Sequence, residues 1–254
     1  MRLYDVDMTE VTRRSPKENI AMAIAGQRIG ARLLPLRLLL ACGVVGPLLF
    51  VALFLAEGAT RPNYSQLRHP VSSLSIGDLG WMQIANFIVA GALLIAFALG
   101  VRRALQPAIW GPVLVGLVGV GLIGSGIFVT DPLNGYPPGT ALVPSARTVH
   151  GILHDLFGIP VFLGLPITCV VLGRRLRRLG QPGWATFSLL AGAAMFVVFI
   201  PARAGFGQRA FADLAGLFQR LALVVGFGWI ALLAVHLIRA PMPGGERAQP
   251  ASKE

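Results

Sequence analysis

Charged side chains are scarce in this chain: they make up 13% of its 254 residues, whereas 55% of the residues are hydrophobic. A soluble domain carries roughly 25% charged residues, so this chain has too little polar surface to keep a globule of its size in water. The mean hydropathy of +0.70 agrees with this interpretation. The lack of charge therefore excludes an ordinary soluble protein and predicts that lipid surrounds most of the chain.

Several motifs that would identify a function are also missing. The two cysteines, Cys42 and Cys169, lie in separate apolar runs without a CxxC or Cys/His spacing, which excludes a zinc finger or a redox pair. The first 37 residues have mixed charge and only a short apolar stretch, so they do not fit a secretory signal peptide. The net charge of +11 comes from arginines scattered between apolar runs, so nucleic acid is not expected as a partner.

Long apolar runs are what the sequence does contain. Six of them can cross a hydrocarbon layer of roughly 30 Å, namely residues 38–56, 81–101, 110–130, 149–172, 184–201 and 214–238. We therefore predict an all-α fold, a polytopic transmembrane bundle of six helices within residues 35–239. Residues 1–34 are expected to form a cytoplasmic arm and residues 240–254 a disordered cytoplasmic tail.

The positions of the basic residues predict the orientation of the bundle. Arginines are dense in the short segments after the second and fourth runs, at Arg102 and Arg103 and at residues 174–178, and sparser in the long segments 57–80 and 131–148. Basic residues accumulate in the cytoplasmic loops of membrane proteins. The sequence therefore predicts a multi-pass protein of the cell (plasma) membrane with both termini in the cytoplasm.

The third run contains glycines at positions 119, 121 and 124, which match G-x-G-x-x-G. A dinucleotide site would require a preceding strand and a soluble βαβ unit, and a membrane run offers neither. We therefore expect these glycines to let neighbouring helices approach closely. The fourth run contains Pro160 and Pro166 and is expected to bend there.

Polar residues within the apolar runs gather near the ends that we assign to the outside. Ionisable groups in membrane helices are costly and usually face the bundle interior or a water-filled cavity. We therefore predict an outward-facing polar pocket, with the loop 68–80 folded over its mouth. Its candidate residues are His69, Ser73, Asn86, Asp131, His150, His154, Asp155, Arg203 and Arg220.

The spacing of His150 and His154 places both imidazoles on one face of a helix. Two such histidines can hold zinc if a carboxylate such as Asp131 supplies a third ligand. The pattern lacks the internal glutamate of HExxH, and the alternative is that both histidines form hydrogen bonds to neighbouring helices and loops. No cofactor is expected unless these three residues hold zinc.

Three segments indicate a family. HPVSSLSIGDLGWMQIANF (69–87), GIFVTDP (126–132) and TVHGILHDLFG (148–158) resemble, in this order and at comparable spacing, six-span bacterial membrane proteins grouped as domain of unknown function 998. The resemblance covers roughly residues 43–239. It implies a six-helix membrane fold and no particular reaction.

Three classes of function remain open from the sequence. The first is a non-enzymatic membrane protein whose outer pocket binds a lipid head group or a small polar ligand, with Arg203 and Arg220 contacting an anionic group. The second is a metal-dependent membrane hydrolase that cleaves a lipid amide or ester with zinc-activated water. The third is a small transporter. Membrane lipid is the expected partner in each class, and the oligomeric state stays open.

Overall fold

The computed structural model describes residues 35–143, 146–206 and 211–240. The first long helix is α3, Leu36–Thr60, followed by the 3-10 turn η1 (Val71–Ser75), α4 (Gly80–Ala104) and α5 (Trp110–Ile127). Helix α6 (Val149–Ile159) continues through a π-helical turn, η2 (Pro160–Gly164), into α7 (Leu165–Arg178). The chain ends with α8 (Pro182–Gly205), the 3-10 turn η3 (Ala212–Leu214) and α9 (Ala215–Arg239).

The all-α prediction is confirmed, because the described residues are 78% helical and contain no strand. Six helices are long and apolar enough to cross a membrane, with α6, η2 and α7 counted as one. Three of the predicted runs end at least four residues too early: α3 continues past position 56 to Thr60, α7 past position 172 to Arg178, and α8 past position 201 to Gly205. All three extensions carry polar residues that the hydropathy pattern assigned to loops.

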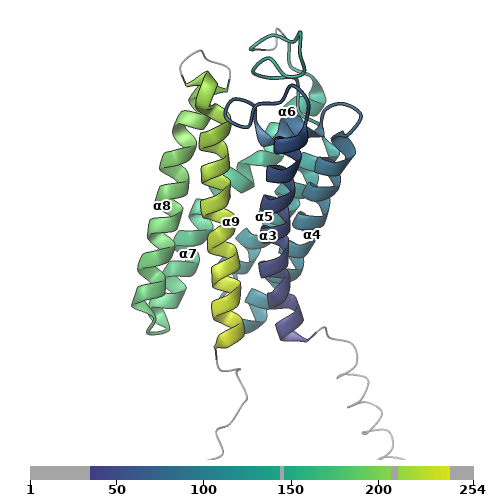
Figure 1. The fold of residues 1–254 in the computed structure, drawn as a ribbon. Helices are drawn as coiled ribbons and strands as arrows, with labels where there is room; N and C mark the ends of the chain where they lie inside the picture. Colours follow the sequence, from purple (N-terminus) through teal and green to yellow (C-terminus); the bar gives the residue numbers. More distant parts are fainter. Residues whose placement is uncertain (1–34, 144–145, 207–210, 241–254) are drawn as a thin grey trace, which may run out of the picture. The chain divides into compact units, whose positions relative to one another are not determined.

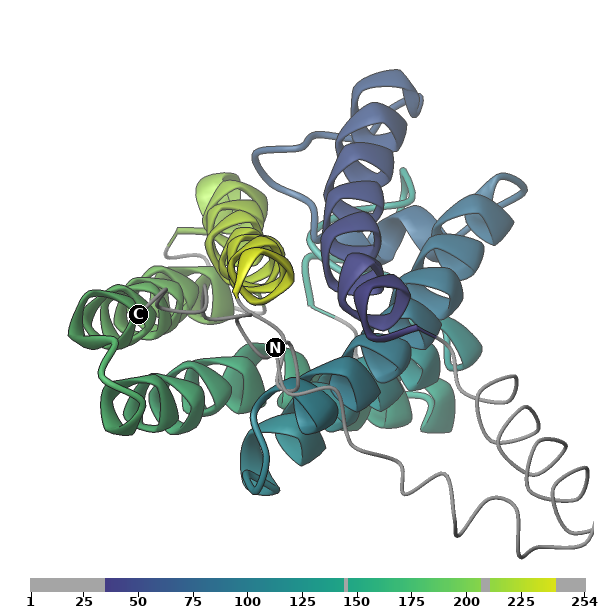
Figure 2. The same cartoon turned by 90° about the horizontal axis from the view of Figure 1, so that it is seen from below.

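The helices of the described bundle pack in a ring that follows the order of the chain. Each helix contacts the next, α5 also packs on α7, and α9 closes the ring against α3. Figure 1 shows α8 beside α9, and the view from below in Figure 2 shows the ring end-on. Residues 36–240 form one compact unit. The predicted arm 1–34 and all but the first residue of the predicted tail 240–254 lie outside the described residues.

Glycine allows α4 and α5 to approach closely. A Cβ atom placed on Gly119 of α5 would lie 2.7 Å from the carbonyl oxygen of Gly91 on α4, nearer than real Cβ contacts come. Gly124 faces the Phe157 ring of α6 in the same way, so a side chain there would have to displace that ring. The glycine-rich third run therefore serves helix packing, as expected from the sequence.

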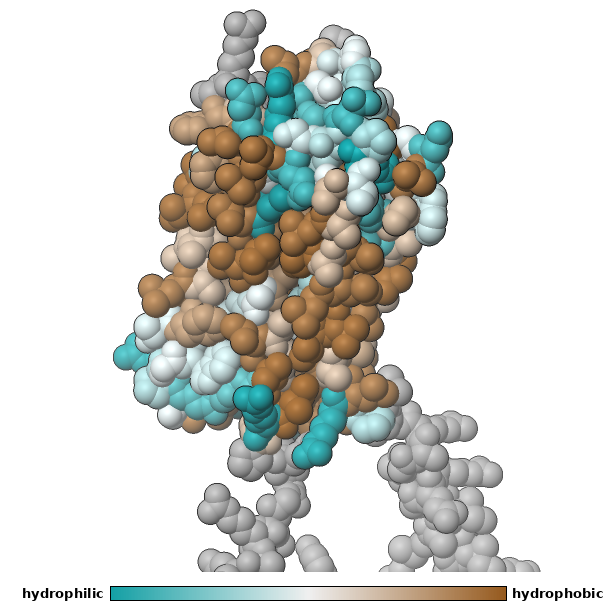
Figure 3. Space-filling model, in the orientation of Figure 1, coloured by the Kyte–Doolittle hydropathy of each residue, from teal (hydrophilic) through white to brown (hydrophobic). Residues whose placement is uncertain are grey.

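The described bundle has two chemically different ends. The upper end in Figure 1, here called the loop end, carries the connections 61–79 and 128–148 and all the described acidic residues, namely Glu57, Asp78, Asp131, Asp155 and Asp213. The opposite end, here called the arginine end, carries Arg37, Arg102, Arg103, Arg174, Arg175, Arg177, Arg178 and Arg239. Between them Figure 3 shows a mostly apolar surface, where side chains such as Leu48 and Leu190 are exposed. This pattern fits a membrane crossed from one end to the other.

Candidate functional site

A cavity lies between the helices in the half of the bundle near the loop end. About 370 Å³ of space there is not filled by atoms, and this figure includes space that is open to the outside. Residues of α3, η1, α4, α5, α6, η2 and α9 line it, and the larger apolar ones are Phe50, Phe87, Leu122, Phe162 and Leu223. The polar lining residues are Ser72, Ser125, His154 and Gln219. The cavity is therefore mainly apolar, with a few polar groups that could orient a ligand.

His154 is the candidate residue that the structure places in this cavity. Its Nδ1 atom lies 3.0 Å from the carbonyl oxygen of Ser125 and 2.8 Å from that of Phe128, both at the end of α5. Carbonyl oxygens only accept hydrogen bonds, so Nδ1 must carry the proton. In the neutral ring Nε2 is then left with its lone pair. His154 therefore offers a hydrogen-bond acceptor to the cavity.

Gly158, one turn below His154, leaves space in the cavity wall. A Cβ atom built on Gly158 would meet no other atom within 4 Å. Two residues later Pro160 lacks an N–H group, and the chain widens into the π-helix η2 before it resumes as α7. The predicted bend of the fourth run is thus a π-helical turn that begins at Pro160, and Val161 and Phe162 of this turn line the cavity.

Asp131 does not reach the cavity, because it holds the start of α6. Its carboxylate accepts hydrogen bonds from the Thr148 hydroxyl at 2.6 Å and the Thr148 backbone N–H at 3.1 Å, and it forms an ion pair with Arg147 at 3.3 Å. Thr148 in turn caps α6 by accepting from the N–H of Gly151. Burial raises the pKa of Asp131, but the bonds from Thr148 and Arg147 outweigh burial and hold that pKa below its ordinary value.

Asp155 forms an ion pair with Arg147 at 2.7 Å. The bond to Asp155 is the main cause that raises the pKa of Arg147. Arg203 is exposed and donates to the carbonyl oxygen of Phe206, close to it in the chain. Asp155 and Arg203 thus belong to separate surface groups at the loop end, and neither lines the cavity.

Arg220 fastens the loop between α3 and α4 to α9. Its Nη1 atom donates to the carbonyl oxygens of Gln66 at 2.7 Å and His69 at 2.9 Å, and Nη2 donates to the Tyr64 hydroxyl. The neighbouring Gln219 accepts from the N–H of Val71 at 2.7 Å. These contacts seat Val71 and Ser72 on the loop-end side of the cavity, where a covering loop was expected. Arg220 is thereby committed to backbone carbonyls.

His69 is buried and Tyr64 is partly buried in the same loop. The Nδ1 atom of His69 accepts from the N–H of Ser65 at 2.9 Å, and its ring contacts the rings of Tyr64 and Tyr136. Burial, together with the positive charges of Arg68 and Arg220, lowers the pKa of His69 to about 4. Burial likewise raises the pKa of Tyr64 to about 12. Both groups are therefore uncharged at neutral pH and act in loop packing.

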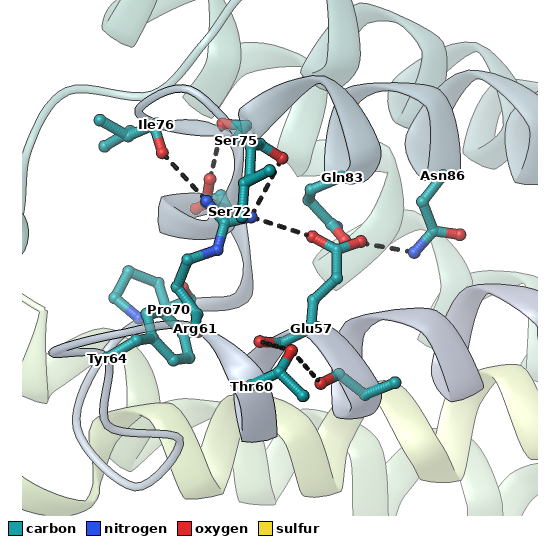
Figure 4. Close-up of polar contacts among 12 residues, drawn as sticks. Glu57, Thr60, Arg61, Tyr64, Pro70, Ser72, Ser75, Ile76, Gln83 and Asn86 are labelled. Atoms are coloured by element: carbon teal, nitrogen blue, oxygen red, sulfur yellow. Dashed lines mark hydrogen bonds and ion pairs between the residues drawn. The ribbon is translucent and has the colours of Figure 1, made fainter.

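A buried polar group that the sequence interpretation missed lies between α3 and α4 (Figure 4). Glu57, with 4% of its surface exposed, forms an ion pair with Arg61 at 3.4 Å, and Arg61 also donates to the carbonyl oxygens of Ile76 and Leu79. Next to it, Asn86 donates to Gln83. The signal was present in the sequence: an acid four residues before an arginine at the end of an apolar run forms an i,i+4 pair if the helix continues.

The three residues expected to hold zinc do not converge. His150 is exposed and packs its ring against Phe128, His154 faces the α5 carbonyls and Asp131 is bound to Thr148. No three His, Cys, Asp or Glu side chains are placed to hold a metal ion within the parts of the chain that are described. The residues therefore do not fit a zinc site. Of the remaining candidates, Asn86 lies in the α3–α4 contact, and Ser73 is fully buried in η1.

Comparison with known proteins gives a family and no activity. No curated protein and no solved structure matches the chain. A family model described as "Protein of unknown function (DUF998)" matches residues 44–236, which is nearly the whole helical bundle. This confirms the resemblance found in the three sequence segments. The chain therefore belongs to the family of proteins of unknown function DUF998.

Proposed function

We propose that this protein binds an uncharged, single-chain amphiphile from the membrane in the cavity beside His154. The observation that carries the proposal is an apolar cavity in a six-helix membrane-type bundle with a single imidazole in its wall. Apolar walls take up a hydrocarbon chain, and the Nε2 atom of His154 accepts a hydrogen bond from the ligand's polar end. The protein is then a lipid-binding membrane protein without catalytic chemistry.

The size of the cavity limits the ligand. The roughly 370 Å³ of empty space includes volume open to the outside, so the enclosed part is smaller than the roughly 300–1,000 Å³ of typical small-molecule cavities. The cavity can therefore take the polar end and the adjoining part of one alkyl chain, with the rest of the chain extending through the opening, and it has no room for a complete phospholipid. The polar end should donate a hydrogen bond, as a hydroxyl or an amide N–H does, because Nε2 offers only a lone pair.

Charge argues against an anionic head group in this cavity. The two arginines expected to contact a phosphate or carboxylate are placed elsewhere: Arg203 is exposed near the end of α8, and Arg220 donates to loop carbonyls. An anion beside the Nε2 lone pair of His154 would lose its hydration and would find no positively charged side chain among the lining residues. The proposal thus keeps the lipid ligand expected from the sequence and replaces its charged head group by a neutral one.

The two alternative classes of function gain less support. A metal-dependent hydrolase needs three converging ligands, and His150, His154 and Asp131 point to different partners. A transporter needs a path to both ends of the bundle, whereas the lining residues of the cavity all come from its loop-end half and middle. We therefore do not propose either activity.

Binding of oleyl alcohol tests the proposal, with oleate as the charged counterpart of equal chain length. The purified protein in nanodiscs should bind oleyl alcohol more tightly than oleate, as measured by native mass spectrometry. His154→Asn keeps a donor near the position of Nδ1 for the α5 carbonyls but removes the acceptor at Nε2. This variant should weaken oleyl alcohol binding by about 2- to 10-fold, the effect of one neutral hydrogen bond.

Gly158→Leu provides a second test that does not depend on the hydrogen bond. The leucine side chain enters open space, so the variant should fold, and Leu has the better helix propensity. By filling the cavity it should abolish binding of both probes. Unchanged binding in a folded Gly158→Leu protein would show that the ligand lies elsewhere and would end the proposal.

A further inference from the structure

The polar group between α3 and α4 has three buried atoms without a hydrogen-bond partner among the described residues, namely Oε1 of Glu57, Nε2 of Gln83 and Oδ1 of Asn86. Side chains lean toward the N-terminus of their own helix, so Glu57 on α3 and Gln83 on the antiparallel α4 extend toward one another (Figure 4). Buried polar atoms of this kind are rare and call for a partner.

The orientation of the Gln83 amide is determined by its neighbours. The Nδ2 atom of Asn86 donates to the backbone carbonyl oxygen of Phe50 at 3.1 Å, and a carbonyl only accepts, so the two ends of the Asn86 amide cannot be exchanged. The same Nδ2 donates to Oε1 of Gln83 at 3.2 Å, which fixes Oε1 as an acceptor. The Nε2 group of Gln83 is therefore a free donor, and Oε1 of Glu57 is a free acceptor in the same polar group.

Charge balance decides what can bind there. Glu57 is already neutralised by Arg61, which is itself satisfied by the carbonyl oxygens of Ile76 and Leu79. A metal cation would bring a second positive charge into a buried site and would face the N–H groups of Gln83. Both effects oppose binding. The partner must be neutral, and it must accept from Gln83 while it donates to Glu57.

We propose that Glu57 and Gln83 form an internal water site in the α3–α4 interface. One water molecule accepts from Nε2 of Gln83 and donates to Oε1 of Glu57, which satisfies both atoms. The site hydrates the carboxylate of Glu57 inside the bundle, where Arg61 is its other partner. The site is independent of the cavity, because neither Glu57 nor Gln83 lines that cavity.

An experimental density map of the full-length protein in nanodiscs tests this site directly. We expect one peak within about 2.6–3.2 Å of both Glu57 Oε1 and Gln83 Nε2, unchanged when sodium salts are replaced by choline salts. A peak that disappears with sodium would identify a cation and overturn the proposal. Direct contact between the two side chains without a peak would overturn it as well.

A double-mutant cycle gives a second readout that needs no map. Gln83→Met removes the donor at similar shape, and Glu57→Gln removes the charge. If water links the two residues, their effects on thermal unfolding are not additive. The matched control is Asp78→Asn, which changes an exposed acid in the loop between α3 and α4. The effects of Asp78→Asn and Gln83→Met on thermal unfolding should be additive. Additivity of the Glu57 and Gln83 variants would contradict the proposal, and if a variant does not fold the density map still decides.

Discussion

His150 and His154 share a helix face and still differ in role. Both residues contact Phe128: the ring of His150 packs on the ring of Phe128, and Nδ1 of His154 donates to the backbone carbonyl oxygen of Phe128. The i,i+4 spacing therefore predicted their common face correctly. The third ligand of the expected zinc site is missing because Asp131, three residues after Phe128, turns toward Thr148 instead. At the scale of single residues, helical spacing predicts which side chains are neighbours but not which distant group they meet.

His69 supplies a prediction at this scale. Its pKa is lowered from 6.5 to about 4 in the folded loop, so the unfolded loop binds a proton more readily. The stabilisation by neutral His69 is complete above pH 6.5 and is lost as the pH falls toward 4. We expect the protection factor of the amides in the loop 61–76, which is the intrinsic exchange rate at each pH divided by the observed rate, to fall by about 10- to 100-fold over this range.

His69→Asn is the control for this effect. The Oδ1 atom of asparagine can accept from the N–H of Ser65 as Nδ1 of His69 does, but the residue does not titrate. The fall in the protection factor should therefore disappear in His69→Asn. An equal fall in both proteins would assign the pH dependence to another group.

The loop between α3 and α4 was expected to fold over the mouth of a polar pocket, and in the structure its residues Val71 and Ser72 line a mainly apolar cavity. Its 3-10 turn η1 lies over the cavity, and Arg220 and Gln219 of α9 hold it there. Asp78, just before α4, is exposed and does not cap this helix, since the N-cap residue of α4 is Leu79. Local sequence preferences predicted where the loop lies in the chain. Its conformation depends on contacts with α9, about 150 residues later in the sequence.

The contact between α4 and α5 gives a prediction at the scale of elements. Gly119→Ala would bring a Cβ atom to 2.7 Å from the Gly91 carbonyl oxygen, whereas in Gly116→Ala the nearest atom is the Ala98 Cβ at 3.8 Å. Both changes raise helix propensity equally, so their difference reports packing. We expect Gly119→Ala to be less stable than Gly116→Ala by about 1–3 kcal/mol in detergent thermal unfolding. Equal stabilities of the two variants would mean that α5 can move away from α4 to accommodate the new methyl group without a measurable loss of stability.

The charge distribution is the main feature of the whole molecule. The described acidic residues lie at the loop end, whereas the arginine end carries eight arginines and no described acidic residue. Basic residues favour the cytoplasmic side of a membrane, so we propose that the arginine end is cytoplasmic. Family membership agrees with the membrane fold and does not decide the orientation.

Reporter fusions measure this orientation. Fusions after Arg103, Arg178 and Arg239 should behave as cytoplasmic, and fusions near Asn63 and Asn134 as external. The reverse pattern would invert the proposed topology, and opposite sides for the fusions after Arg103 and Arg239 would contradict an even number of crossings between them. The cavity and the internal water site then both lie in the outer half of the membrane.

The sequence by itself determined the number of helices, their approximate bounds, the separation of charge and the family. These features depend on local composition and on the length of apolar runs, which need no knowledge of distant contacts. The tertiary structure decided which polar residues meet. Arg220 binds the carbonyl of Gln66, 154 positions away, and Glu57 faces Gln83 across two helices. Such pairs depend on the rotation of each helix about its axis and on the path of the loops, which only packing fixes.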